Sequence, residues 1–382
     1  MRKAFVYRIY PSKSQQRRLE HVRETCRRFY NDCLAERKTA YEQRGESIGK
    51  VVQLRHVKER KATNPYAKDL HSHILQIVVD DLDKAFQAFF RRVKAGDAPG
   101  YPRFKGRNRW KGFGLKEYGN GFKIDGRRLR VSGIGRIAVR WHRPLEGQIK
   151  TLRIVKRAGK WYAAFSCITE EQPLESTGRD VGIDLGVASL LTNSDGEKVN
   201  NPRWYRSEQR KLRVLQRRVA RRKKGGSNRK KAVLALQRQH ERIGNRRKDF
   251  LNKLAHSLIT HYDRIALEDL RITNMVRNPH LAKSILDTGW GYLTQHLMSK
   301  AASAGRLVLL VDPRNTSQNC SQCGRLVAKD LSERVHQCPH PDCGVVLDRD
   351  HNAAINILKR AGQVRWGISS PLGGLPQEAV PF

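Results

Sequence analysis

Hydrophobic and polar positions alternate over residues 1–10, a pattern that predicts a short strand. Pro11 ends this alternation, and Ser12 is a residue type that caps helices. Two segments with helical spacing of apolar residues follow, at residues 14–45 and at residues 69–93. Their apolar positions include Leu19, Val22, Cys26, Phe29, Tyr30 and Cys33 in the first segment, and Leu75, Val78, Val79, Leu82, Phe86, Phe89 and Phe90 in the second.

Short alternating runs separated by glycine turns replace the helical pattern between about residues 111 and 170. Within this region, Lys150–Lys156 and Lys160–Ile168 predict a hairpin that turns at Ala158-Gly159. We therefore predict a small β-barrel or sheet that the N-terminal strand completes. The helical segments are inserted between its first and second strands.

Strand and helix patterns alternate in the second half of the chain, after a linker at residues 170–178. The predicted elements are a hairpin of strands at 180–185 and 188–192, a basic helical hairpin within 206–248 that turns at 225–228, a helix at 250–260, a strand at 263–268, a helix at 285–304, a strand at 306–311 and a helix at 352–360. This alternation predicts an α/β sheet domain. The last residues are rich in Gly and Pro and predict a loose tail.

Composition narrows the possible functions. A chain of 382 residues is long enough for two or three domains, and its 76 Lys and Arg against 36 Asp and Glu give a formal net charge of +40. Such a chain repels itself unless a polyanion neutralises it, and this favours nucleic acid over a merely highly charged surface. No apolar run approaches the roughly 20 residues of a membrane helix, and the N-terminus lacks a secretory signal. We expect a cytoplasmic protein.

Positive charge is concentrated in residues 206–248, which contain 18 Lys or Arg and only two acids, Glu208 and Glu241. Charge of one sign cannot be neutralised by pairs within the helices, so we predict phosphate contact rather than a solvated helix face. The densest cations are Arg221, Arg222, Lys223 and Lys224. A second candidate region interleaves Tyr101, Phe104 and Trp110 with Arg103, Lys105, Arg107 and Arg109, a composition that fits base stacking as well as core packing.

Seven cysteines fall into two groups. Three of them, Cys26, Cys33 and Cys167, lie in apolar segments and are predicted to be buried. The other four, Cys320, Cys323, Cys338 and Cys343, have the spacing of a zinc ribbon, with glycine after each pair. The gap within the second pair is longer than usual, and His340 inside it is an alternative ligand. We predict a structural Zn²⁺ ion.

Acidic residues at the ends of apolar runs stand out in so basic a chain. Asp184 and Glu268 end two predicted strands, and Asp348 and Asp350 precede the last predicted helix. A lone carboxylate beside apolar sequence is costly, so each acid is either a local cap or ion pair, or part of a shared site. Acids from three distant segments can converge on divalent cations, and Mg²⁺ prefers carboxylate oxygens.

Four motifs together resemble a known family. They are Gly182-Ile183-Asp184-Leu185-Gly186, Leu267-Glu268-Asp269-Leu270, the sequence TSQNCSQCG at 316–324, and the sequence DRDHNAA at 348–354. In this order they resemble TnpB, the RNA-guided nuclease of insertion sequences that is related to type V CRISPR effectors. The resemblance extends over roughly residues 4–361.

The resemblance implies a multidomain α+β protein. A RuvC-like (RNase H type) α/β nuclease domain with an inserted zinc ribbon would follow a β-barrel wedge domain with an inserted helical recognition domain. The implied bounds are 1–10 and 106–176 for the wedge, 11–105 for the recognition domain, 177–316 and 345–361 for the nuclease domain, 317–344 for the ribbon and 362–382 for a flexible tail.

It also implies a function. Asp184, Glu268 and Asp350 would be catalytic acids that hold two Mg²⁺ ions, whereas Asp348 would be structural. The partners would be a transposon-derived guide RNA and double-stranded target DNA, bound in a monomeric ribonucleoprotein. The protein would read only a short motif beside the target, near Gln76, while base pairing reads the rest. Two alternatives stay open: a non-cleaving nucleic-acid-binding regulator, and a transposase that joins DNA strands itself.

Overall fold

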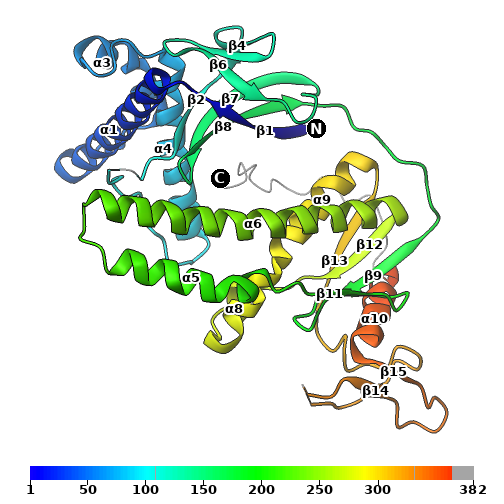
Figure 1. Cartoon of the computed structure of the whole chain (residues 1–382). Coiled ribbons are helices and arrows are strands. Elements are labelled where there is room, and N and C mark those ends of the chain that lie inside the picture. The colour runs from blue at the N-terminus through cyan, green and yellow to red at the C-terminus, as the bar shows by residue number, and fades with distance from the viewer. Residues whose placement is uncertain (108, 331, 364–382) are drawn as a thin grey trace. The chain divides into compact units, whose positions relative to one another are not determined.

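The computed structural model describes residues 1–107, 109–330 and 332–363. The chain divides into two compact units, Met1–Glu170 (unit 1) and Glu171–Phe382 (unit 2), and Figure 1 labels elements of both where there is room. In the described part of the chain, no helix is both long enough and apolar enough to cross a bilayer.

Unit 1 is built on an eight-stranded sheet with the order β2-β7-β8-β1-β6-β5-β4-β3. Its strands are β1 (Arg2–Tyr10), β2 (Gly112–Leu115), β3 (Glu117–Tyr118), β4 (Gly121–Asp125), β5 (Arg128–Val131), β6 (Gly135–Arg140), β7 (Gln148–Arg157) and β8 (Lys160–Ile168). The predicted β7–β8 hairpin is confirmed, and β1 lies between β8 and β6 and is antiparallel to both. The small β3 strand contacts β7, so the sheet curls back toward its first edge.

Four helices of unit 1 lie between β1 and β2, where the sequence predicted two helical segments. They are α1 (Lys13–Arg44), α2 (Lys50–Arg55), α3 (Val57–Thr63) and α4 (Ser72–Lys94). Ser12 caps α1 in a capping box with Gln15, and Gly45 ends the helix in the left-handed conformation. The short helices α2 and α3 were not predicted, because neither contains two turns of apolar spacing.

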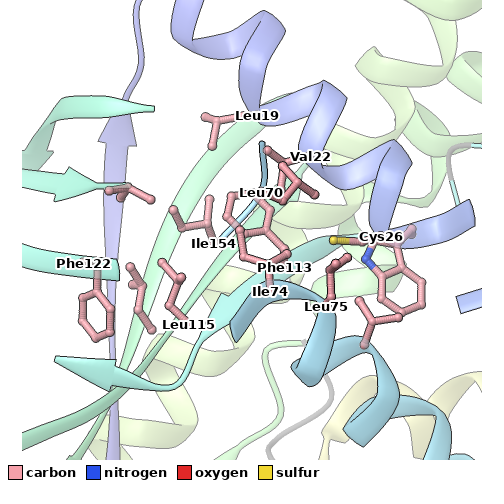
Figure 2. Close-up of a cluster of buried hydrophobic side chains, with 14 of the residues drawn as sticks. Leu19, Val22, Cys26, Leu70, Ile74, Leu75, Phe113, Leu115, Phe122 and Ile154 are labelled. Carbon is pink, nitrogen blue, oxygen red and sulfur yellow. The ribbon is translucent and has the colours of Figure 1, made fainter. Parts of the chain in front are cut away.

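The core of unit 1 lies between α1, α4 and the sheet. In Figure 2, Leu19, Val22 and Cys26 of α1 and Ile74 and Leu75 of α4 point toward side chains of the sheet. Phe113, Leu115, Phe122 and Ile154 are among those sheet side chains. The three isolated cysteines are free and buried, as predicted. Phe90, in contrast, is 60% exposed near the end of α4.

Unit 2 contains a five-stranded sheet with the order β11-β10-β9-β12-β13. Its strands are β9 (Asp180–Asp184), β10 (Ser189–Asn193), β11 (Lys198–Asn200), β12 (Arg264–Glu268) and β13 (Leu307–Val311). Strand β9 pairs with β10 in the predicted antiparallel hairpin and with β12 in parallel, and β12 and β13 are also parallel. A separate two-stranded ribbon consists of β14 (Val335–Gln337) and β15 (Val346–Asp348).

Helices cover both faces of this sheet. They are α5 (Trp204–Ala220), α6 (Ser227–His261), α7 (Ile272–Met275), α8 (Pro279–Thr288), α9 (Trp290–Ala304) and α10 (Arg349–Gln363). The apolar sides of α6 and α9 pack on one face, and α10 packs on the other. Strands buried on both faces have nearly continuous apolar sequences, which explains why β9 and β12 were readily predicted.

Two sequence predictions in unit 2 need correction. The single helix expected at residues 285–304 is two helices, α8 and α9, because Gly289 between them has a left-handed φ of 75°. A Cβ at Gly289 would lie 2.9 Å from Leu251 Cδ1, so the break also allows close packing on α6. The last helix reaches Gln363, beyond the expected start of the tail at 362, and residues 364–382 lie outside the described residues.

Candidate functional site

Asp184 and Glu268 are the last residues of the neighbouring parallel strands β9 and β12. Side chains alternate between the faces of a sheet, so Asp184 shares the face of Gly182, while Val181 and Ile183 point into the core under α6 and α9. Glu268 likewise shares the face of Ala266, which packs against α10. Both carboxylates therefore lie at the same edge of the sheet and on its α10 face.

Gly182 lets α10 approach this face closely. A Cβ at this position would lie 2.1 Å from the carbonyl oxygen of Ala354 in α10. Asp350 is in the first turn of α10, and Asp348 caps the helix by accepting from the backbone N–H groups of Asp350 (3.0 Å) and His351 (3.2 Å). The three predicted acids thus come from three segments, and the capping role of Asp348 agrees with its predicted structural role.

The surroundings of Asp184 are acidic. Burial raises the pKa of Asp184 to about 8, with Glu268 and Asp350 adding to the increase and Arg349 opposing it. Burial also raises the pKa of Glu268, against the effect of a hydrogen bond from Thr316. Among the described residues, no side chain donates a hydrogen bond to, or forms an ion pair with, the carboxylate of Asp184 or Asp350. A cation from outside the chain would relieve this concentration of negative charge.

Four thiols form the tightest group of metal-ligand atoms in the described residues. The sulfurs of Cys320, Cys323, Cys338 and Cys343 all lie within 4.8 Å of one another. The Cys320–Cys343 and Cys323–Cys338 sulfur pairs are 3.6 and 3.7 Å apart. Tetrahedral zinc with Zn–S bonds of about 2.3 Å requires sulfur separations of about 3.8 Å, so the cluster indicates a structural zinc.

The turns around the thiols account for the unusual spacing. Gly324 and Gly344 both have left-handed φ angles, of 76° and 56°, and their N–H groups donate to the carbonyls of Cys320 and His340. The longer second gap is thus accommodated in a backbone turn, and His340 is not part of the sulfur cluster. Burial opposes ionisation of the Cys320 thiol, but backbone N–H groups of Cys323 and Gln322, together with His336, lower its pKa to about 6.

The structure confirms a basic helical hairpin. Helices α5 and α6 pack along Leu212 and Ile243, and Arg221, Arg222, Lys223 and Lys224 are exposed at the turn between them. An open cleft of about 480 Å³ lies beside this turn and is lined by Val214, Arg217, Arg218, Arg221 and Arg222.

The other predicted nucleic-acid contacts lie in unit 1. Gln76 is half-buried on α4. Tyr101 is 43% exposed, Arg103 is exposed, and Lys105 lies over the ring of Tyr30 at 5.4 Å. Trp110 is 9% exposed and belongs to the core, so the aromatic residues of this segment divide between packing and exposure.

Comparisons with known proteins place these features in a family. The model of OrfB from IS605, described as "Probable transposase", matches residues 164–279, and a "Cas12f1-like, TNB domain" model matches residues 290–357, which include the four cysteines. A "Putative RNA-guided DNA endonuclease" from Streptomyces pristinaespiralis is 35% identical over 94% of this chain and 89% of its own length. This chain belongs to the TnpB family.

Other comparisons agree with this assignment. The "Putative RNA-guided DNA endonuclease InsQ" of Escherichia coli (strain K12), also similar to this TnpB chain, is 30% identical over 93% of the chain and 91% of its own length. The TnpB chain also has a Cas12f-like α+β fold: it matches a cryo-EM structure of the Cas12f1–sgRNA–target DNA complex with a TM-score of 0.60 and 14% identity, covering 94% of this chain and 98% of the other.

One further match concerns the N-terminus. A model described as "Helix-turn-helix domain" matches residues 1–46 of this TnpB chain. In the structure these residues form strand β1 and the single 32-residue helix α1, with no second helix. The match therefore does not favour a transposase that binds DNA through a pair of helices.

Sequence analysis of this TnpB chain did not identify the residues that support the acids. Thr316, Asn352 and Asn356 all donate or accept hydrogen bonds between α10 and the segment that leads to Cys320. Their signal in the sequence is weak: Asn352 and Asn356 are one helical turn apart, and Thr316 opens the cysteine motif. Without the fold, nothing connects these positions.

Proposed function

We propose that this protein is an RNA-guided DNA endonuclease of a transposable element, which cleaves its target by two-metal-ion phosphodiester hydrolysis. The observation that carries the proposal is the placement of Asp184 and Glu268 at the ends of two neighbouring parallel strands, on the sheet face covered by α10, with Asp350 in the first turn of that helix. The two relatives described above, which align over 94% and 93% of this chain, are both named as RNA-guided DNA endonucleases, and this supports the same activity here.

The proposed catalytic domain is RuvC-like, at residues 177–316 and 345–361, with the zinc ribbon at 317–344 inserted. Its support is the mixed sheet with three parallel strands and the acids at their shared edge. Carboxylate oxygens suit Mg²⁺, and Asp184, Glu268 and Asp350 would hold it. When bound, the ions supply an activated water and stabilise the leaving oxygen of the phosphodiester.

Unit 1 is proposed to bind the guide RNA and the target DNA and to fix their positions. Its curled sheet, at 1–10 and 106–176, would be the wedge domain, and its helices within 11–105 would be the recognition domain. Gln76 on α4 would lie where the protein recognises a short DNA motif beside the target. Base pairing with the guide RNA would recognise the target sequence itself. Tyr101, Arg103 and Lys105 would add contacts to bases and phosphates.

The proposed partners are a transposon-derived guide RNA and double-stranded target DNA, in a ribonucleoprotein with one copy of the protein. The exposed cations of the α5–α6 turn support phosphate contact, which gives affinity but little sequence information.

The test is guided cleavage. We would sequence the RNA that co-purifies with the full chain and offer target DNA that matches its guide segment, beside a randomised flanking sequence. The wild type is expected to cut in Mg²⁺, whereas Asp184→Ala should retain RNA and lose at least about 10³-fold in cleavage rate because the metal site loses a ligand. Wild-type binding of target without any cleavage would instead favour a non-cleaving regulator.

A further inference from the structure

Side chains on one face of α10 form hydrogen bonds with the backbone of the segment that leads to Cys320 and Cys323. The side-chain amide of Asn356 donates to the carbonyls of Thr316 (2.9 Å) and Asn319 (2.6 Å). One turn earlier, the fully buried Asn352 donates to Asn319 (2.8 Å) and accepts from the N–H of Ser321 (2.8 Å). Farther along the same face, Lys359 donates to the carbonyl of Ser321, and Arg360 donates to the carbonyls of Asp312 and Arg314.

The same segment contacts an acid of the proposed site. Thr316 is 4% exposed, and its hydroxyl lies 2.5 Å from Oε1 of Glu268 and 3.1 Å from the carbonyl oxygen of Pro313. The Pro313 carbonyl can only accept, and an ionised Glu268 can only accept. The single hydroxyl hydrogen of Thr316 therefore serves the carboxylate when Glu268 is ionised, and the bond fixes the direction of one carboxylate oxygen.

These bonds join two acids through one short path. Asp350 lies in the first turn of α10. Asn356 on the same helix donates to the carbonyl of Thr316, and the hydroxyl of Thr316 donates to the carboxylate of Glu268. Glu268 ends a strand, and in the described part of the chain its carboxylate accepts a side-chain hydrogen bond from Thr316 alone. The distance between Glu268 and Asp350 therefore depends on the segment before Cys320 as well as on the sheet.

We propose that Thr316 is a positioning residue that orients Glu268 for divalent cations, and that Asn356 holds Thr316 in place. This inference rests on the proposed function and adds a residue that touches neither substrate nor cation. Groups that orient metal ligands in this way typically change metal affinity by 10–100-fold when removed. The zinc ribbon is thereby coupled to the acid site through backbone that both share.

The test compares variants that differ only in the hydroxyl. Thr316→Val removes it while keeping the shape, and Thr316→Ser restores it. The probe is Mn²⁺, titrated calorimetrically into the full, zinc-loaded chain, and the acid site is defined as the binding that is lost in Asp184→Asn. Thr316→Val is expected to weaken Mn²⁺ binding by roughly tenfold or more, and Thr316→Ser to bind nearly as the wild type does.

Cleavage provides a second readout. In Thr316→Val, the Mg²⁺ concentration at half-maximal rate should rise about tenfold, while the rate at saturating Mg²⁺ recovers most of the wild-type value. Thr260→Val is the matched control, because its hydroxyl bonds only within α6, to the carbonyl of His256. Zinc content and melting temperature are measured for each variant. If Thr316→Val does not fold, Thr316→Ala replaces it as the variant without a hydroxyl. Its Mn²⁺ affinity is then compared with that of Thr316→Ser, and the same loss is expected.

The outcomes separate two failures. Equal Mn²⁺ affinity in the wild type, Thr316→Val and Thr316→Ala, with Asp184→Asn deficient, overturns the positioning role and leaves the proposed function intact. Unchanged Mn²⁺ binding in Asp184→Asn contradicts the proposed acid site itself. A loss in Thr316→Val that Thr316→Ser does not restore assigns Thr316 to packing and also overturns the inference.

Discussion

Two half-buried acids of unit 1 differ in their charge partners from the acids at the strand ends of unit 2. In unit 1, Asp80 and Asp81 lie in an apolar stretch of α4, and each has cationic partners. Both carboxylate oxygens of Asp81 accept from Arg153, at 2.5 and 3.0 Å, while Asp80 lies 2.8 Å from Lys50 and 2.9 Å from Lys116. In unit 2, burial raises the pKa of Asp184; the charges of Glu268 and Asp350 add to the rise, and Arg349 opposes it.

This difference distinguishes structural acids from a site that needs a cation. An acid neutralised by Lys or Arg stabilises the fold that brings the pair together. A cluster of acids destabilises its own fold until something positive binds. The four thiols of the ribbon belong to the second kind, because clustered thiolates repel one another and zinc neutralises their charge. Unit 2 thus contains two groups of acidic side chains, the carboxylates and the thiols, whose negative charge a bound cation would neutralise.

Removing zinc should have the largest effect. Structural zinc contributes roughly 10–16 kcal/mol of apparent binding free energy in small zinc modules, so Cys338→Ser should lose the metal and the order of the ribbon. Elemental analysis should find one zinc per wild-type chain and much less than one in the variant. Cys167→Ala is the control, since this buried cysteine lies in unit 1 and should leave the zinc content unchanged. Full zinc in Cys338→Ser, with loss in His340→Ala, would show that His340 is the ligand.

Neutralising unpaired cations should weaken nucleic-acid binding next most strongly. Changing Arg221, Arg222, Lys223 and Lys224 together to Gln should lower affinity for all sequences and reduce the log–log salt slope by up to roughly 3 units. The control variant changes four cations that already pair with acids, namely Lys38, Arg44, Lys253 and Arg325. Equal losses in the two variants would mean that net charge alone, and not the hairpin turn, determines binding.

Breaking an ion pair of unit 1 should cost stability without affecting the metal site. Asp81→Asn leaves the partly buried Arg153 without its charge partner and should lower the melting temperature of the full chain by roughly 2–6 °C. Asp97→Asn, an exposed acid at the end of the same region, should change it by less than about 1 °C. An unchanged melting temperature in Asp81→Asn would remove the distinction between the two kinds of acid.

The smallest expected effect depends on pH. Burial alone would raise the pKa of Asp80, but Lys50 and Lys116 bring it below its ordinary value of 3.8. Its stabilising contribution, about 0.5–1 kcal/mol, is therefore present above that value and is lost as the pH falls through the lower pKa of the folded state. The melting temperatures of the wild type and Asp80→Asn should differ at pH 7 and converge below about pH 3. A constant difference over this range would exclude the electrostatic cause.

Sequence patterns predicted β9 and β12 from their apolar runs, and the β7–β8 hairpin from its alternating residues and its turn at Ala158-Gly159. They also identified the thiols, because spacing along the chain determines a zinc knuckle. They singled out Asp184 by its place at the end of an apolar run, but only the fold shows that Asp81, another acid in apolar sequence, has a cationic partner. Thr316 and Asn356 were missed for the same reason: their partners are 48 and 40 residues away. The break at Gly289 was missed because glycine also occurs within helices.

The most direct test of the account measures the melting temperature of the zinc-loaded chain with and without Mn²⁺. A cation at 100 times its dissociation constant should stabilise the wild type by about 2.7 kcal/mol, or several degrees. Asp184→Asn should melt at or above the wild-type temperature without Mn²⁺, because ionising this acid beside other acids is costly and an amide cannot ionise, and it should gain almost nothing when Mn²⁺ is added. If Asp184→Asn is less stable than the wild type without Mn²⁺ and is stabilised equally by the ion, Asp184 is a structural acid and the proposed metal site is wrong.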